Sequence, residues 1–375
     1  MNFSIIAKSK LPIDFINELN NDFTERNVDK ILTGMSEERY TTFRVNYLKS
    51  NEVEVEDELV KNGLEFEKVR ITESNFNFNA YVIYNKNEKD LSKLKIYEDG
   101  KIYVQSISSM IPPIILRPEP GERVLDMAAA PGGKTTQMAA MMNNEGYILA
   151  NEIDKFRCEK LEYNVEKQGA SIVHIINKDG TQLNNSAKSF DKILVDAPCS
   201  GEGRFIVSNK KTYEHWSLKM QKELVEIQKK LLSNAINLCK INGTILYSTC
   251  ALSLAENEKV IDWAINNFNI EIEKININIC IEKNTRVKLN DLSQTSKLET
   301  NLTNKSETNL TSKLETNLTN KSETNLNEEK EFVSYNSWVT KGNKKGLSDE
   351  IKKTIKILPN KLLEGFYVAK IKKLG

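Results

Sequence analysis

Two cysteines and one aspartate stand where a parallel sheet would gather reactive side chains. Asp196 ends a predicted strand over residues 190–196, and Cys199 follows it closely. Cys250 directly follows a second predicted strand, 244–249. Because the carboxyl ends of neighbouring parallel strands border one crevice, we expect all three side chains to face a single site.

Two thiols beside a carboxylate suit methylation at carbon 5 of a pyrimidine. That carbon is a poor nucleophile, and addition of a thiolate at carbon 6 makes it enamine-like, able to attack a methyl sulfonium. A carboxylic acid near ring nitrogen 3 can donate a proton and stabilise the developing charge. A base must afterwards remove the carbon 5 proton so that the thiol can leave. The target base must also be unstacked to admit the thiol.

The other cysteines are interpreted as small buried hydrophobes, the usual state of a lone cysteine. Five cysteines without a CxxC pair favour neither a disulfide framework nor a zinc site, and we expect no metal. The three are Cys158, Cys239, which we place on the apolar face of a predicted helix, and Cys280.

Residues 124–134, VLDMAAAPGGK, predict a buried strand, a turn of small residues and the start of a helix. This order builds nucleotide pockets in wound α/β sheets. The GGKT ending resembles a phosphate loop, but Ala128 replaces the first glycine of that pattern and Pro131 has no N–H to donate. A site for ATP or GTP is therefore not favoured, and a G-x-G-x-x-G dinucleotide fingerprint is absent.

Two further acids follow predicted strands of the same sheet. Glu152 comes after the strand 147–151, where a carboxylate can hold two ribose hydroxyls. Asp179 comes after the strand 172–176 and can receive an adenine amino group. With the small-residue loop and no phosphate cradle, these acids suit an adenosine that lacks phosphates, which points to S-adenosylmethionine.

The alternation of strands and helices from residue 124 predicts an α/β fold with a doubly wound, mostly parallel sheet. A final strand over 366–371 is expected to enter antiparallel, as in the sheets of methyltransferases. The first hundred residues predict a small α+β domain, with a helix over 11–34 that stops at Gly34. The predicted crossover and flanking helices are 134–142, 154–168, 217–240 and 255–267. In the N-terminal part, the predicted strands are 43–47, 64–69 and 80–84, and a second predicted helix is 53–62.

The composition limits the class of protein to which the chain can belong, but it does not indicate a function. Its 375 residues carry a net charge of +1, although ten lysines in 341–375 predict either a local basic surface or a solvated tail. No signal segment or membrane span is apparent, so a cytoplasmic location is expected. Residues 296–311 recur almost unchanged as 312–327, which predicts a disordered low-complexity insertion over 286–329.

The motifs together resemble the Nol/Nop/Sun family of RNA cytosine-5 methyltransferases. The resemblance covers roughly residues 11–270 and 355–373, and it implies a Rossmann-like class I methyltransferase sheet. The implied domains are an RNA-contacting part over 1–100 and a methyltransferase part over 101–285 and 330–375. The motifs that carry it are DMAAAPGGKTTQMA, ANEID, KDG, KILVDAPCSGEGRF, YSTCALSLAENE and EGFYVAKIKK.

The resemblance also implies a role for each matching residue. Cys250 would be the nucleophile at carbon 6, Cys199 would assist release of the product, and Asp196 would contact the base and the cofactor. Lys134 would lie near either the substrate or the cofactor, a choice left open here. S-adenosylmethionine would be bound by Met127, Ala128, Ala129, Ala130, Pro131, Gly132, Gly133, Lys134, Glu152, Asp179 and Asp196.

Several alternatives stay open at this point. Ribosomal RNA is the favoured substrate and transfer RNA the second. A DNA cytosine-5 methyltransferase would leave Cys250 without a task, and a small-molecule methyltransferase would not need two thiols. A catalytically silent RNA-binding module for ribosome assembly has no need of Cys199, Cys250 and Asp196. The family usually has cysteine at the position of Met127, a departure that backbone contacts would tolerate.

Overall fold

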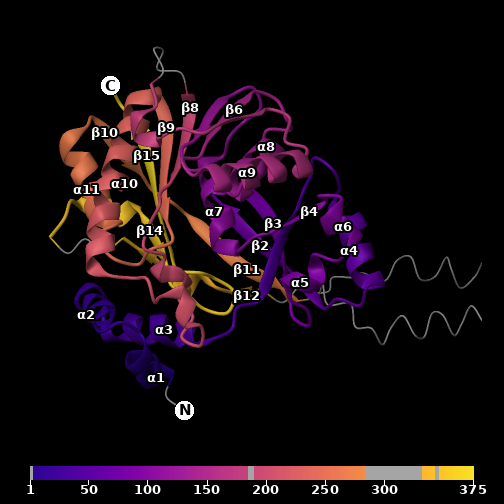
Figure 1. Ribbon diagram of the computed structural model, residues 1–375, viewed down its shortest axis with the longest axis horizontal. Coiled ribbons are helices and arrows are strands. Elements are labelled where there is room, and N and C mark those ends of the chain that lie inside the picture. Colours follow the sequence, from indigo (N-terminus) through magenta and orange to yellow (C-terminus); the bar gives the residue numbers. More distant parts are fainter. Residues whose placement is uncertain (1–2, 185–189, 284–331, 343–345) are drawn as a thin grey trace, which may run out of the picture.

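A nine-stranded mixed sheet contains the strands that the sequence analysis singled out (Figure 1). The computed structural model describes residues 3–184, 190–283, 332–342 and 346–375. The strand order is β13-β14-β15-β9-β8-β5-β6-β7, with β10 paired to β15. The bounds are β5 Arg123–Asp126, β6 Tyr147–Asn151, β7 Val173–Ile176, β8 Phe190–Asp196, β9 Cys239–Thr249, β10 Ile270–Glu273, β13 Val339–Lys341, β14 Ile355–Ile357 and β15 Phe366–Lys373.

The predicted parallel core of this sheet is confirmed. The neighbours β9, β8, β5, β6 and β7 pair in parallel, and β15 pairs antiparallel with β9 as expected. The predicted strands 147–151 and 190–196 coincide with β6 and β8. The expected place of Cys239 on a helix was wrong, because the backbone becomes extended there and Cys239 is the first residue of β9, where it is buried.

Helices cover both faces of this sheet, as in a doubly wound fold. Successive residues of β5 face opposite layers, with Val124 in the hydrophobic cluster that includes α7, α8 and α9, and Leu125 in the cluster that includes α10 and α11. Asp154 caps the start of α9 by accepting from the Arg157 N–H at 2.8 Å. These helices span α7 Ile107–Leu116, α8 Gly133–Met141, α9 Lys155–Gln168, α10 Leu218–Leu238 and α11 Glu258–Asn267.

A second, antiparallel sheet packs against the first through α7. Its order is β12-β11-β2-β3-β1-β4, and one hydrophobic cluster joins Ile71 of this sheet to Ile111 of α7 and Val124 of the larger sheet. Three of its strands, β4, β11 and β12, come from segments that the sequence assigned to the methyltransferase part. Long-range pairs such as Ile279 with Ile71 place them here. The bounds are β1 Thr41–Val45, β2 Phe66–Glu73, β3 Phe76–Ile83, β4 Ile102–Val104, β11 Ile277–Glu282 and β12 Phe332–Ser334.

The N-terminal helices, indigo in Figure 1, differ from the single predicted helix over 11–34. The chain forms α1 (Phe3–Lys10), α2 (Ile13–Asp22) and α3 (Glu25–Ser36), and it is extended at Phe23 and Thr24 between the last two. Gly34 lies inside α3 rather than at its end. A Cβ there would fall 1.8 Å from the Pro359 carbonyl oxygen, so the glycine permits close packing of the helix.

The remaining helices are α4 (Glu52–Lys61), α5 (Glu88–Leu91) and α6 (Lys95–Glu98), all beside the second sheet. The predicted insertion over 286–329 lies outside the described residues. Over the ranges that the structure describes, no helix has the length and apolar character required to span a membrane.

A buried ion pair connects the C-terminal segment to the first residue of α11. The Lys356 ammonium lies 2.9 Å from Glu258 Oε2 and donates to the Leu252 carbonyl at 2.6 Å. Both side chains are essentially inaccessible, at 2 and 0 % exposure. Burial of charge in this way is tolerated because the two groups satisfy one another.

Replacement of this lysine by methionine should therefore lower the free energy of unfolding. For Lys356→Met we expect a loss of about 3–5 kcal/mol, because Glu258 loses its ammonium partner while staying buried. Denaturant titration followed by circular dichroism measures the change. The matched control is Lys352→Met at an exposed ion pair, which should change stability by at most about 1 kcal/mol. Equal effects of the two substitutions would contradict the account.

Candidate active site

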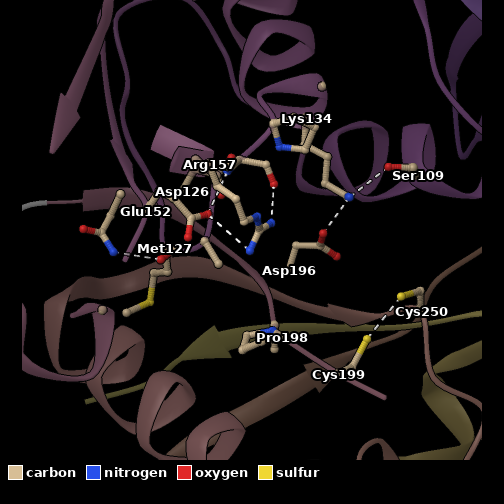
Figure 2. A pocket seen from close by; sticks show the side chains of 18 of the residues that line it. Ser109, Asp126, Met127, Lys134, Glu152, Arg157, Asp196, Pro198, Cys199 and Cys250 are labelled. Carbon is tan, nitrogen blue, oxygen red and sulfur yellow. Dashed lines mark hydrogen bonds and ion pairs between the residues drawn. The ribbon is translucent and has the colours of Figure 1, made fainter. Parts of the chain in front are cut away.

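A cavity of about 680 Å³ lies at the ends of β5, β6 and β8 and beside the loop after β9 (Figure 2). With the exception of Gly132, every residue that the sequence predicted for the site lines this cavity. The predicted residues on its wall are Met127, Ala128, Ala129, Ala130, Pro131, Gly133, Lys134, Glu152, Asp179, Asp196, Cys199 and Cys250.

Gly132 instead turns the chain from the small-residue loop into α8. Its φ of +106° is a backbone conformation that side chains rarely adopt, and a Cβ would lie 3.1 Å from Leu161 Cδ1 of α9. The glycine thus sets the path of the loop and lies behind the wall that a ligand would touch.

Glu152, at the end of β6, fixes this loop from inside. Its carboxylate is 1 % exposed, accepts from the Asp154 N–H at 3.0 Å and reaches the Ala130 N–H at 3.3 Å. Arg157 lies 3.6 Å away and donates to the Ala130 carbonyl at 2.8 Å. The predicted ribose-binding acid is therefore held rigidly at the cavity, with a cation beside it.

Asp126 is a site residue to which the sequence analysis assigned no role. It is fully buried, and its Oδ2 accepts from the Thr135 hydroxyl at 2.8 Å. Its Oδ1 has no hydrogen-bond partner among the described atoms, although the residue lines the cavity. Burial raises the pKa of Asp126 to about 7. An unsatisfied buried oxygen of this kind is suited to a donor or cation on a ligand.

Asp179 lies further along the same wall, in the turn after β7. It accepts from the Thr181 hydroxyl at 2.7 Å and from the Thr181 N–H at 2.9 Å. These hydrogen bonds hold the pKa of Asp179 below its usual value. It therefore presents an ionised acceptor where the sequence placed an adenine contact.

Lys134, from the first turn of α8, reaches across the cavity to the end of β8. Its ammonium lies 2.6 Å from Asp196 Oδ2 and donates to the Ser109 hydroxyl oxygen at 2.9 Å (Figure 2). Ser248 donates to the other Asp196 oxygen at 2.7 Å. Asp196 is thus fixed between a cation and a hydroxyl, facing the thiols.

The two predicted thiols meet at the same end of the cavity. Cys199 Sγ and Cys250 Sγ are 3.2 Å apart and share a hydrogen bond, as Figure 2 shows. That hydrogen bond, together with desolvation, raises the pKa of the Cys199 thiol well above its usual range. Either sulfur can donate this hydrogen bond, so a proton can pass between Cys199 and Cys250.

Backbone contacts hold the two cysteine loops together. The Gly203 N–H donates to the Cys250 carbonyl at 2.8 Å, and the Gly365 N–H donates to the Gly203 carbonyl at 2.9 Å. A Cβ on Gly203 would lie 2.0 Å from the Gly365 oxygen, so only glycine permits this approach.

Two arginines lie near the thiols, and the sequence analysis assigned no role to either of them. Arg204 lines the cavity, and its Nε lies 3.9 Å from Glu364 Oε1. Arg39 comes from the segment before β1, lies 3.7 Å from the same oxygen and donates to the Gly203 carbonyl at 2.9 Å. Arg39 is distant in sequence from every motif, so only the fold brings it here. Cations at a cavity mouth suit a phosphate-bearing substrate.

Known proteins resemble this chain over much of its length. A transfer RNA (cytosine(49)-C(5))-methyltransferase from Pyrococcus abyssi is 37% identical over 237 residues, which cover 63% of this chain and 74% of that protein. A ribosomal RNA small subunit methyltransferase F from Vibrio atlanticus is 37% identical over 238 residues, covering 62% of this chain and 49% of that protein. The chain thus spans about half the length of such ribosomal RNA relatives.

Structural comparison agrees. A methyltransferase homologue protein from Pyrococcus horikoshii is 26% identical, with a TM-score of 0.66, and the alignment covers 97% of this chain and 100% of that one. This confirms the predicted Rossmann-like methyltransferase fold. The family profile described as 16S rRNA methyltransferase RsmB/F matches residues 113–372, which include every predicted site residue. The chain therefore belongs to the 16S rRNA methyltransferase RsmB/F family.

Proposed function

We propose that this protein is an S-adenosylmethionine-dependent RNA methyltransferase that forms 5-methylcytosine, with Cys250 as nucleophile and Cys199 assisting release. The observation that carries the proposal is the pair of sulfurs 3.2 Å apart, in one cavity with Asp196 and the loop between β5 and α8. A cofactor site alone would suit many methyltransferases. Two thiols at one end of it suit covalent activation of a pyrimidine.

The residues on the cavity wall fit S-adenosylmethionine. Glu152 offers a buried carboxylate to the ribose hydroxyls, Asp179 offers an acceptor to the adenine amino group, and Asp126 Oδ1 is a buried acceptor still to be satisfied. When bound, this cofactor supplies a methyl group on a sulfonium, which is an electrophile. The protein's part is to hold that group near the thiols and to exclude water.

At the other end of the cavity, the side chains divide the work on the cytosine. The Cys250 sulfur forms a bond to carbon 6, and the electron pair of the 5,6 double bond becomes available at carbon 5. The Lys134 ammonium and the Asp196 carboxyl, 2.6 Å apart, form a unit that can hold a proton at ring nitrogen 3.

Release reverses the covalent step. A base takes the carbon 5 proton, the electrons of that carbon–hydrogen bond restore the 5,6 double bond, and the bond between carbon 6 and sulfur breaks with its electrons returning to Cys250. Because the Cys199 thiol lies 3.2 Å from that sulfur and shares a hydrogen bond with it, it can protonate the leaving thiolate. Arg204, which lines the cavity and is exposed, supplies positive charge for the RNA backbone.

We propose small-subunit ribosomal RNA as the substrate, in line with the family description, and transfer RNA as the second candidate, supported by the archaeal relative. The test incubates the purified chain with methyl-labelled cofactor and each RNA, and then locates 5-methylcytosine by bisulfite sequencing. Label in ribosomal RNA supports the first substrate and label in transfer RNA the second. Cofactor binding without transfer to any RNA would instead support a silent RNA-binding module and overturn the proposed activity.

Replacement of each of the two cysteines should have a different effect on the reaction. Cys250→Ala should lower methyl transfer by at least about 10³-fold, because it removes the nucleophile. Cys199→Ala should accumulate a protein–RNA adduct that survives denaturing electrophoresis, because attack proceeds and release does not. The exposed-helix variant Lys160→Met serves as control. Retained activity in Cys250→Ala, or no adduct in Cys199→Ala, would refute the assigned roles.

Lys134 should matter for catalysis more than for cofactor affinity. Lys134→Met should reduce kcat by about 10²-fold, because it removes a donor beside developing charge. Calorimetry should show that the cofactor Kd changes by no more than about 3-fold, since the ammonium contacts Asp196 and Ser109 rather than the adenosine wall. The reverse pattern, with affinity lost and kcat kept, would assign Lys134 to the cofactor.

Glu152 should matter for cofactor affinity more than for catalysis. Glu152→Gln should weaken cofactor binding by about 10-fold or more, because a charged acceptor for the ribose is lost. Glu159→Gln, on the exposed side of α9, is the matched control and should bind the cofactor as the wild type does. Equal affinities for the two variants would remove Glu152 from the cofactor site.

A further inference from the structure

Two buried glutamates cross between the loops that carry the thiols. Glu202 belongs to the loop after β8 and is 1 % exposed, and Glu256 belongs to the loop after β9 and is 0 % exposed. Neither was assigned a role by the sequence analysis, and neither lines the cavity. Ionised carboxylates are rarely buried unless hydrogen bonds compensate them, so their contacts show what they hold.

Glu256 holds the chain on both sides of Cys199. Its Oε1 accepts from the Ser200 N–H at 2.9 Å, and its Oε2 accepts from the Ser200 hydroxyl. Gln228 of α10 donates to Glu256 Oε1 at 2.9 Å and to the Pro198 carbonyl at 2.9 Å. The peptides before and after Cys199 are therefore both tied to this one carboxylate and its glutamine.

Glu202 holds the chain that follows the other cysteine. Its Oε2 accepts from the N–H groups of Leu252 and Ser253 at 2.9 and 2.8 Å. Its Oε1 accepts from Trp216 Nε1 at 3.0 Å and from Gln221 Nε2 at 3.1 Å. Each carboxylate therefore originates in one cysteine loop and fixes the backbone of the other.

Burial has a measurable effect on one of these acids. Desolvation, with the charge of Glu202 adding to it, raises the pKa of Glu256 to about 7. The ties to Ser200 and Gln228 oppose this rise because they stabilise the ionised form. An apolar side chain would fill the same space without the cost of burying a charge. Glu256 differs from such a side chain in the hydrogen bonds that it accepts.

We propose that Glu256 is a positioning residue for Cys199 and that Glu202 is a positioning residue for Cys250, so that the two carboxylates govern different steps of the reaction. The inference rests on the proposed function, in which Cys250 attacks and Cys199 assists release. Loss of the Glu256 ties moves Cys199 away from the sulfur it must protonate. Loss of the Glu202 ties shifts the loop that aims Cys250 at carbon 6.

The test separates attack from release by the choice of RNA. RNA transcribed with 5-fluorocytidine triphosphate has no proton at carbon 5, so the adduct cannot eliminate once it is methylated, and its appearance reports attack and methyl transfer without release. Ordinary RNA reports attack and release together. Fluorinated and ordinary RNA are each prepared as small-subunit ribosomal RNA and as transfer RNA transcripts. Each transcript is incubated with cofactor and the full chain, and the adduct is measured by denaturing electrophoresis.

For Glu256→Gln we expect adduct formation on fluorinated RNA within about 2-fold of the wild-type rate and at least about 10-fold more adduct on ordinary RNA, because a charged hydrogen bond is lost from the release step only. For Glu202→Gln we expect at least about 10-fold slower adduct formation on fluorinated RNA and no accumulation on ordinary RNA. Glu223→Gln, exposed on α10, is the control and should match the wild type.

A second variant guards against misfolding of the first. Gln228→Met removes the ties to Pro198 and Glu256 without changing either acid, and it should also accumulate adduct on ordinary RNA. Thermal melting confirms that each variant is folded. If the wild type forms no adduct on either fluorinated RNA, the proposed function fails. If the wild type forms it but Glu256→Gln and Glu202→Gln behave alike, the positioning inference alone is overturned.

Discussion

The site depends on the contact between two sulfur atoms, and that contact depends on how two parallel strands end. β8 and β9 pair in a register that sets Asp196 opposite Ser248, so the loops that follow leave the sheet side by side. Strand pairing alone would leave those loops free to diverge. The Gly203 N–H bonded to the Cys250 carbonyl, and the crossed ties of Glu202 and Glu256, hold the sulfurs at 3.2 Å.

In the proposed function, the rest of the cavity holds a methyl donor next to these sulfurs. The loop between β5 and α8 provides a wall with little side-chain bulk, and Glu152 fixes that loop from within. Lys134 then links the loop to Asp196, so this ion pair joins the proposed cofactor wall to the thiol end. Beyond the thiols, Arg39 connects an N-terminal segment to the same end, which explains why the site requires both parts of the chain.

The sequence was sufficient for the elements with local signals. Apolar runs bounded by polar turns located β6 and β8, and the small-residue loop, with the acids and cysteines after strand ends, located part of the cavity wall. Pairing between strands that are distant in the sequence could not be predicted. The sequence around Ile279 carries no local signal that Ile279 pairs with Ile71, and Arg39 lies in none of the quoted motifs. Cys239 was misplaced because an apolar helix end and a buried strand start have the same composition. Gly34 was misread because close packing against Pro359 uses the same residue type as a helix stop. The buried glutamates were passed over because their role lies in the backbone groups of another loop.

The most direct measurement of the central claim is the identity of the sulfur bonded to the base. The full chain is incubated with S-adenosylmethionine and RNA transcribed with 5-fluorocytidine triphosphate, the adduct is digested with protease and nuclease, and the modified peptide is sequenced by mass spectrometry. The account predicts a fluorinated, methylated cytosine on Cys250. The same modification on Cys199 would contradict it, because Cys199 would then be the nucleophile.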